Sequence, residues 1–83
     1  MTSKFAEKVV LVTGAGSGIG RQTAITFAKD GAKVIVSDIN ANAGQTTVDE
    51  IIANGANAIF VQMDVSKSEE VKSGIARGIQ YFG

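Results

Sequence analysis

Three short apolar runs alternate along the chain with three stretches whose apolar residues recur at helical spacing. The apolar runs indicate strands at Lys8–Thr13, Lys33–Asp38 and Ala58–Met63. They are apolar without alternation, which is typical of parallel strands covered on both faces. The sequence therefore predicts an α/β fold of order β-α-β-α-β-α, with right-handed crossovers, in a single domain over residues 1–83.

The stretches between these runs predict three helices, each with one apolar face. The first runs from about Gly18 to Asp30, the second ends near Asn54, and Asn40 or Asn42 can cap the second. A Ser66-x-x-Glu69 capping box starts the third. The residues expected to face the sheet are, helix by helix, Ile19, Thr23, Ala24, Phe27 and Ala28; Val48, Ile51 and Ile52; and Val71, Ile75, Ile79 and Phe82.

A glycine-rich stretch, TGAGSGIG at residues 13–20, stands between the first strand and the first helix. It fits G-x-G-x-x-G in neither register, because the third position falls on Ile19 or Arg21, but it fits T-G-x-x-x-G-I-G. Glycines let a backbone turn tightly and approach a pyrophosphate, and the helix that follows points its N–H groups at the anion. The alternative is a strand-to-helix turn that binds no ligand.

With this motif in this position, the sequence resembles the start of a short-chain dehydrogenase/reductase. The resemblance implies a Rossmann-type parallel sheet, the first half of a doubly wound fold, in an oxidoreductase that transfers hydride between NAD(H) and an alcohol or ketone. It also implies that Ser17 lies near the ribose or phosphate, and that Ile19 donates its backbone N–H to the pyrophosphate while its side chain packs below. The implied phosphate cradle is Gly14, Ser17, Gly18, Ile19 and Gly20.

Asp38 ends the second predicted strand. An acidic residue at this place can accept hydrogen bonds from both hydroxyls of the adenosine ribose. A 2′-phosphate would meet this carboxylate as a like charge, and the neighbouring Ile39 adds no basic group, so NAD is favoured over NADP. The alternative is a solvated aspartate in a strand–helix turn.

Asp64 and Val65 follow the third predicted strand, at the edge where open α/β sheets bind ligands. The resemblance implies that Asp64 accepts a hydrogen bond from the adenine amino group and that the backbone of Val65 lines the ring. Judged on the residues alone, Asp64 is equally suited to capping the helix that begins near Ser66.

The catalytic residues of the resembling family are not found. That family uses a Tyr with a Lys four positions later, a Ser before them and an Asn, whereas the single tyrosine here is Tyr81, which no lysine follows at that spacing. The chain corresponds to about the first third of a typical member. We therefore predict an enzyme by family whose 83 residues lack the catalytic Ser, Tyr and Lys and are inactive alone. The alternative is a stand-alone nucleotide-binding or assembly module without catalytic activity.

Composition narrows the remaining classes. The formal net charge is zero and no basic block occurs, which argues against nucleic acid and against anionic membranes as partners. Cysteine and histidine are both absent, so no disulfide and no thiolate or imidazole metal site is expected. No apolar run approaches the ~20 residues of a membrane span, and no signal-peptide core is present. These features predict a soluble cytoplasmic protein without a metal site.

The first predicted strand is central in a doubly wound fold, where the strand order begins 3-2-1 and then reverses. Here its second edge has no partner, so Val9–Val12 would present unpaired backbone groups and apolar side chains. We therefore expect the chain to form a homo-oligomer or to pair with a complementary C-terminal polypeptide.

Overall fold

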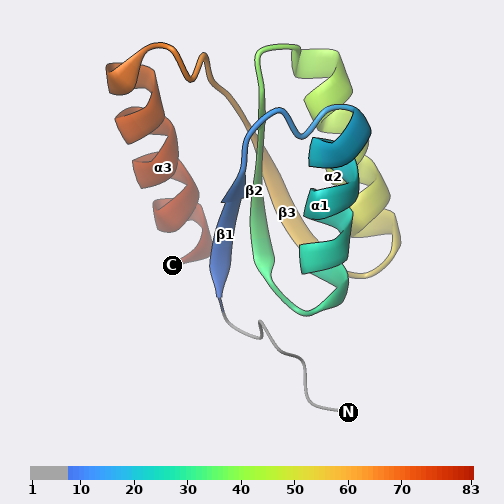
Figure 1. Cartoon of the computed structure of the whole chain (residues 1–83). Helices are drawn as coiled ribbons and strands as arrows, with labels where there is room; N and C mark the ends of the chain where they lie inside the picture. Colours follow the sequence, from blue (N-terminus) through green and yellow to red (C-terminus); the bar gives the residue numbers. More distant parts are fainter. Residues whose placement is uncertain (1–7) are drawn as a thin grey trace.

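The three apolar runs form one parallel sheet in the computed structural model, which describes residues 8–83. Its strands are β1 (Val9–Val12), β2 (Lys33–Asp38) and β3 (Asn57–Gln62), in the spatial order β1-β2-β3 (Figure 1). The predicted order and parallel pairing are confirmed, with strand ends within one residue of the prediction. Residues 1–7, which the predicted domain includes, lie outside the described residues.

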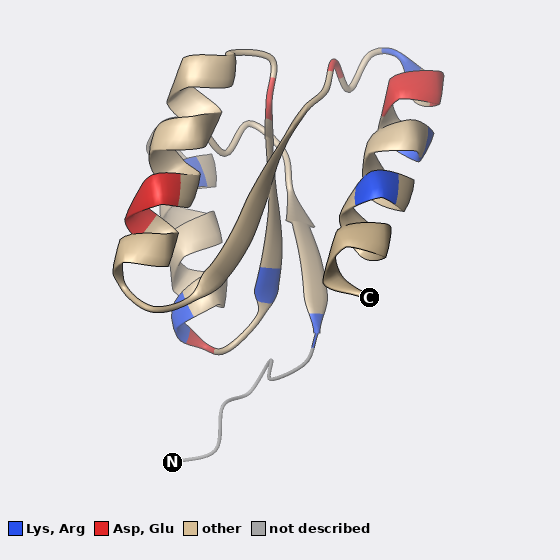
Figure 2. Ribbon diagram, turned by 180° about the vertical axis from the view of Figure 1, so that it is seen from behind, with Lys and Arg blue, Asp and Glu red and all other residues tan. Residues whose placement is uncertain are grey.

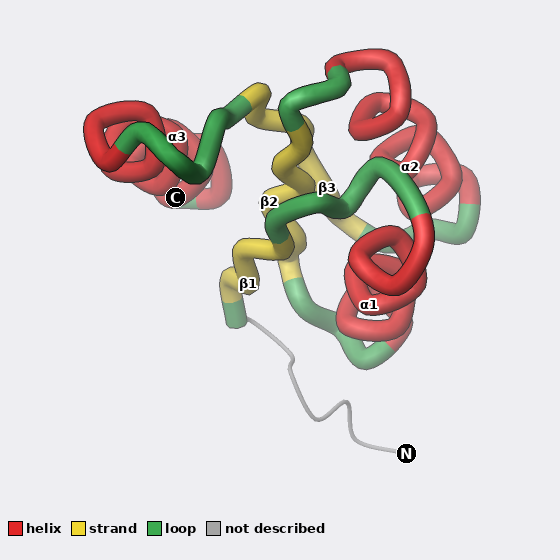
Figure 3. The backbone as a smooth tube through the Cα atoms, turned by 45° about the horizontal axis from the view of Figure 1, so that its top comes forward, coloured by secondary structure: helices red, strands yellow, loops and turns green. Residues whose placement is uncertain are grey.

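Three helices cover the two faces of this sheet. They are α1 (Gly18–Lys29), α2 (Ala41–Ala53) and α3 (Ser68–Phe82). Helices α1 and α2 lie side by side on one face, and α3 lies on the other (Figures 1 and 3). Right-handed crossovers that step from β1 to β2 to β3 in one direction must place both connecting helices on the same face.

The central strand β2 is buried on both faces. Val34 and Val36 belong to the core beneath α1 and α2, whereas Ile35 belongs to the smaller core beneath α3. Each of these side chains is at most 1% exposed. Burial on both faces explains why Val34, Ile35 and Val36 form an uninterrupted β-branched run without polar alternation.

The predicted inner faces of α1 and α2 are wrong at one residue each. Helix α1 buries Ala24, Ile25 and Ala28, while Ile19 is 87% exposed and does not pack below the turn. In the first turn of α1, Gly20 is the residue that lies against the glycine-rich loop, next to the Gly14 carbonyl. Neighbouring residues of a helix are rotated by about 100°, so the side chain of Ile19 points away from that contact.

In α2, the buried stripe consists of Gly44, Thr47, Val48 and Ile51, at positions i, i+3, i+4 and i+7. The predicted Ile52 lies beside this stripe and is 54% exposed. Asn40 caps the helix as predicted, because its side chain accepts a hydrogen bond from the Ala43 N–H at 3.0 Å.

The predicted capping box of α3 is wrong. The N-cap is Lys67, whose side chain makes no capping bond, and the helix begins at Ser68. Ser66 instead donates its hydroxyl to Asp64 Oδ1 at 2.7 Å. A carboxylate is a stronger acceptor than a neutral partner, so it draws Ser66 into the preceding turn and away from the helix.

Two glycines bring α3 close to the sheet. Gly74 and Gly78 are the buried residues of the helix, and a Cβ on Gly78 would overlap the side chain of Ile35. A Cβ on Gly74 would overlap the terminal methyl of Met63. Close packing against the sheet therefore explains why α3 contains two glycines, although glycine weakens a helix. Ile79, which was predicted to belong to the apolar face of this helix, is 53% exposed.

Lys, Arg, Asp and Glu are interspersed over the described residues, and neither sign gathers on one face of them (Figure 2). None of the helices within residues 8–83 combines the length and the apolar character that crossing a membrane requires.

Replacing Gly78 by alanine should lower the free energy of unfolding by up to about 2 kcal/mol. Overpacking against Ile35 costs about 1–3 kcal/mol, and the gain in helix propensity returns ~1 kcal/mol of it. Urea unfolding measures the change. The matched control is Ser73→Ala on the exposed side of α3, which should shift stability by less than about 0.5 kcal/mol. Adding Ile35→Val to Gly78→Ala should recover part of the loss, and strict additivity would contradict this account.

Candidate functional site

The turns that follow β1, β2 and β3 all lie at the carboxyl edge of the sheet (Figure 1). Parallel strands make this unavoidable, since all three end at the same edge. The residues predicted to bind the cofactor lie in these turns, in the first turn of α1 or, in the case of Asp38, at the last position of β2. The edge is tied together between strands, because the Gln62 side chain donates to the Ile39 carbonyl at 3.0 Å.

The glycine turn joins β1 to α1 through two residues in left-handed conformation. Gly14 has φ 62° and Gly18 has φ 58°, a region that side chains with a Cβ rarely adopt. Gly20 sits so close to the Gly14 carbonyl that any Cβ there would overlap it. The three glycines of the motif therefore bring α1 directly against the end of β1.

The N-terminus of α1 is not capped by a side chain. Ser17 is the N-cap, with extended backbone angles of φ −158° and ψ 163°, and its hydroxyl makes no capping bond. The N–H groups of Gly18, Ile19 and Gly20 have no intrahelical acceptor, as at the start of any helix. Together with the positive end of the helix dipole, they form a group of donors suited to an anion.

Asp38 faces the glycine turn from the end of β2. Its Oδ2 accepts a hydrogen bond from the Gly16 N–H at 2.8 Å, and its Oδ1 accepts one from the Asn40 N–H at 2.8 Å. A carboxylate offers about four lone-pair positions, so about two remain for further donors. The structure thus brings together the two strongest signals in the sequence.

Gly16 is a residue whose role the sequence analysis missed, because the motif treats its position as variable. A Cβ on Gly16 would lie 2.6 Å from the Ala43 Cβ and 2.8 Å from Asp38 Oδ2. Only glycine therefore lets the turn reach the carboxylate and the start of α2 together.

Three apolar side chains stand exposed along this edge, one after each strand. Ile19 is 87% exposed, Ile39 is 65% exposed and Val65 is 59% exposed. Exposed branched side chains that lie along a polar edge are suited to contact with a flat apolar ring.

Asp64 is held in a turn of its own and does not cap α3. Its Oδ1 accepts hydrogen bonds from the Ser66 hydroxyl at 2.7 Å and from the Ser66 N–H at 3.0 Å. The Ser66 hydroxyl, followed by the Ser66 N–H and the nearby Lys67 charge, lowers the pKa of the Asp64 carboxyl below its usual value. The carboxylate is therefore ionised at neutral pH.

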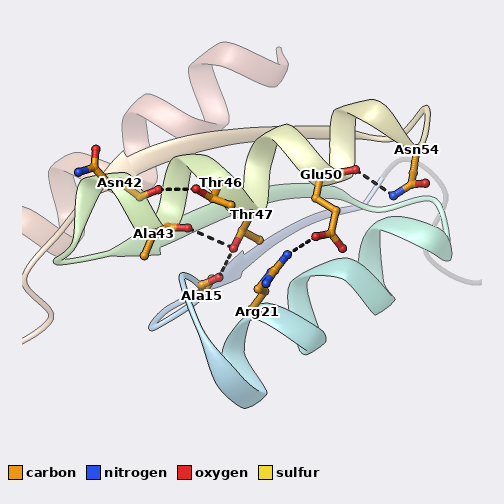
Figure 4. Close-up of polar contacts among 8 residues, drawn as sticks. All are labelled: Ala15, Arg21, Asn42, Ala43, Thr46, Thr47, Glu50 and Asn54. Carbon is orange, nitrogen blue, oxygen red and sulfur yellow. Dashed lines mark hydrogen bonds and ion pairs between the residues drawn. The ribbon is translucent and has the colours of Figure 1, made fainter.

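Thr47 is a second residue that the sequence analysis missed. It is fully buried on α2, and its hydroxyl donates to the Ala15 carbonyl of the glycine turn at 2.8 Å (Figure 4). One signal in the sequence could have indicated it. Thr47 is a polar residue on the helix face that otherwise carries Gly44, Val48 and Ile51, which are small or apolar.

Tyr81 is not brought to this edge. It lies near the end of α3, which runs from the carboxyl edge to the opposite end of the sheet (Figure 1), and it stacks edge-on against Phe82 with ring centroids 5.2 Å apart. Within residues 8–83, the structure groups no three potential metal ligands together.

Comparisons with known proteins agree with this geometry. The family model described as short chain dehydrogenase matches residues 8–83. Cyclohexanol dehydrogenase of Acinetobacter sp. (strain SE19) is 45% identical over 83 residues, which are 100% of this chain and 33% of the relative. The chain therefore spans about one third of the length of that relative.

Many solved structures resemble the fold, among them two that contain NADH or NAD. One is a 7α-hydroxysteroid dehydrogenase complexed with NADH and 7-oxo glycochenodeoxycholic acid, with TM-score 0.93, 40% identity, and coverage of 99% of this chain and 32% of that one. The other is a short chain dehydrogenase/reductase from Burkholderia phymatum in complex with NAD, with TM-score 0.91, 39% identity, and coverage of 96% and 28%. With the glycine turn, the fold and the family match in agreement, this chain belongs to the short-chain dehydrogenase/reductase family.

Proposed function

We propose that the chain binds NAD(H) at the carboxyl edge of its sheet, as the cofactor-binding part of an oxidoreductase that transfers hydride between nicotinamide and an alcohol or ketone. The observation that carries the proposal is the hydrogen bond from the Gly16 N–H to Asp38 Oδ2, 2.8 Å long. It joins a phosphate-binding turn to the acidic residue of the next strand. The NADH and NAD held by the two similar structures support the same cofactor here.

The pyrophosphate would lie over the glycine turn and the first turn of α1. Cβ positions built on Gly14 and Gly18 meet no atom within 4 Å, so the space beside both residues is open. The N–H groups of Ile19 and Gly20 supply donors, and Ser17 stands beside them for the ribose or a phosphate oxygen. The residues present therefore fit the diphosphate of a dinucleotide.

The adenosine half would lie across the turns after β2 and β3. Asp38 offers its remaining lone pairs to the two ribose hydroxyls, while Ile39 and Val65 provide exposed apolar surface for the adenine. Ionised Asp64 is suited to accept from the adenine amino group. The 2′-phosphate of NADP would be repelled by the negative Asp38, and the uncharged Ile39 offers no compensating positive charge, so NAD is favoured over NADP.

Hydride chemistry is supplied by the nicotinamide when it is bound. This chain's residues hold and orient the adenosine and diphosphate. Tyr81, the only tyrosine, is the next-to-last residue of α3, and this helix ends away from the carboxyl edge of the sheet (Figure 1). This position supports the proposal that these 83 residues are inactive alone.

We also propose that the open edge of β1 is covered by another polypeptide, either a second copy of the chain or a complementary C-terminal polypeptide. Among residues 8–83, β1 pairs only with β2, and Val9 on it is 42% exposed. An apolar groove of ≈ 470 Å³ runs along the outer side of α1, lined by Ile19, Gln22, Thr23, Thr26, Phe27 and Asp30. Unpaired strand edges and apolar grooves favour association.

Asp38→Ala should weaken NAD binding about tenfold or more and abolish the preference for NAD over NADP, because it removes the charged acceptor. Calorimetric titration with both dinucleotides measures this. Asp49→Ala, on the exposed side of α2, is the matched control and should leave both affinities unchanged. Unchanged discrimination in Asp38→Ala would remove the ribose assignment.

Ser66→Ala should raise the pKa of Asp64 toward its ordinary value, because the hydroxyl hydrogen bond is the largest cause of the lowered pKa. Carboxyl NMR titration reads the pKa directly. The pKa of Asp64 is lower in the folded chain than in the unfolded chain, so the ionised carboxylate stabilises the folded state at neutral pH. This contribution to the free energy of unfolding is lost as pH falls through the lowered pKa. Ser68→Ala, with no bond to Asp64 in the structure, is the control.

Size-exclusion chromatography with light scattering should give a mass above that of one chain. Val9→Lys should shift the mass toward the monomer, because a charge on the strand edge opposes strand addition. Ile52→Lys, at an apolar position on α2 that is 54% exposed, should not. A wild-type chain that runs as a well-dispersed monomer and melts cooperatively would contradict this expectation.

A further inference from the structure

Thr47 is the one side chain of α2 that hydrogen-bonds the glycine turn in the structure described. The residue is 0% exposed, and its Oγ1 lies 2.8 Å from the Ala15 carbonyl oxygen and 3.3 Å from the Ala43 carbonyl oxygen of its own helix. A hydroxyl has a single proton to donate. The shorter distance assigns that proton to Ala15, 32 residues away in the sequence.

The Ala15 carbonyl and the Gly16 N–H belong to one planar peptide group. Thr47 holds the oxygen end of this group, and Asp38 Oδ2 holds the hydrogen end at 2.8 Å. The preceding N–H, that of Ala15, donates to the Ser37 carbonyl at 2.9 Å. A rotation of the Ala15–Gly16 peptide would therefore break the bond to Thr47 and the bond to Asp38 at the same time.

We propose that Thr47 is a positioning residue for the nucleotide site: its hydroxyl locks the Ala15–Gly16 peptide and thereby fixes both the glycine turn and the Asp38 carboxylate. The inference rests on the proposed function, because it assigns Thr47 to the same NAD(H) site. Thr47 itself is fully buried and acts through the peptide, not by contact with the cofactor.

The chain provides a matched control at the next position. Thr46 is also a threonine of α2. Its hydroxyl donates a hydrogen bond to a carbonyl of its own helix, that of Asn42, at 2.9 Å (Figure 4). It is exposed and makes no bond to the glycine turn in the described structure. Thr46→Val therefore repeats the chemical change of Thr47→Val without touching the peptide.

Thr47→Val keeps the side-chain shape and removes the donor, which leaves the buried Ala15 carbonyl unpaired. We expect NAD affinity to fall about tenfold by calorimetry. By NMR, exchange of the Gly16 amide with solvent should accelerate beyond the acceleration of the core strand amides. Thr47→Ser, which keeps the hydroxyl, should restore both readouts, and Thr46→Val should change neither. Thr47→Ala takes the place of Thr47→Val if the latter does not fold.

Wild-type affinity in Thr47→Val together with unchanged Gly16 exchange would overturn the proposal. Equal losses in Thr47→Ser and Thr47→Val would also overturn it, because shape and not the hydroxyl would then matter. Failure of the wild-type chain to bind NAD would overturn the proposed function. Gly16 exchange needs no ligand, so in that case it still decides whether Thr47 holds the peptide.

Discussion

Burial of β2 on both faces is the constraint on which the rest of the structure depends. Val34, Ile35 and Val36 are at most 1% exposed, because helices cover the strand from both sides. Parallel pairing on both edges then fixes β1 and β3 in register with it. The end of β2 therefore has one possible position relative to the two neighbouring turns, and Asp38 stands at that end.

Close backbone contacts hold the glycine-rich turn against the end of β2 at the carboxyl edge of the sheet. Gly20 allows α1 to begin against Gly14, and Gly16 allows the turn to reach Asp38. Each contact excludes a Cβ, so the motif specifies where backbone must approach backbone or carboxylate. The uncapped helix start and the acidic residue, which are weak signals singly, become a candidate site because these contacts hold them together.

The sequence predicted the parts of the fold that local chemistry determines. Doubly buried strands need unbroken apolar runs, and Asn40 needs only a nearby N–H to cap α2. Prediction from the sequence failed where a contact between residues far apart in the chain determines which side chain is buried or what it binds. Choosing Ile25 over Ile19 as the buried residue requires knowing how α1 is rotated on the sheet. Thr47 is polar on a buried stripe, and its partner lies 32 residues away, so its purpose could not be inferred from spacing.

The doubly wound fold binds a dinucleotide with two mononucleotide halves that meet beside the first strand. The three strands described here form one such half. In the proposed function, its site residues would hold the adenosine and the diphosphate of the cofactor. On that proposal, recognition of the cofactor and the choice between NAD and NADP would depend on contacts within this half. Among the described residues β1 pairs with β2 alone, so they place no strand on its other side. The proposal therefore separates cofactor selection, which would use this half, from hydride transfer, and it places the boundary between them at the open edge of β1.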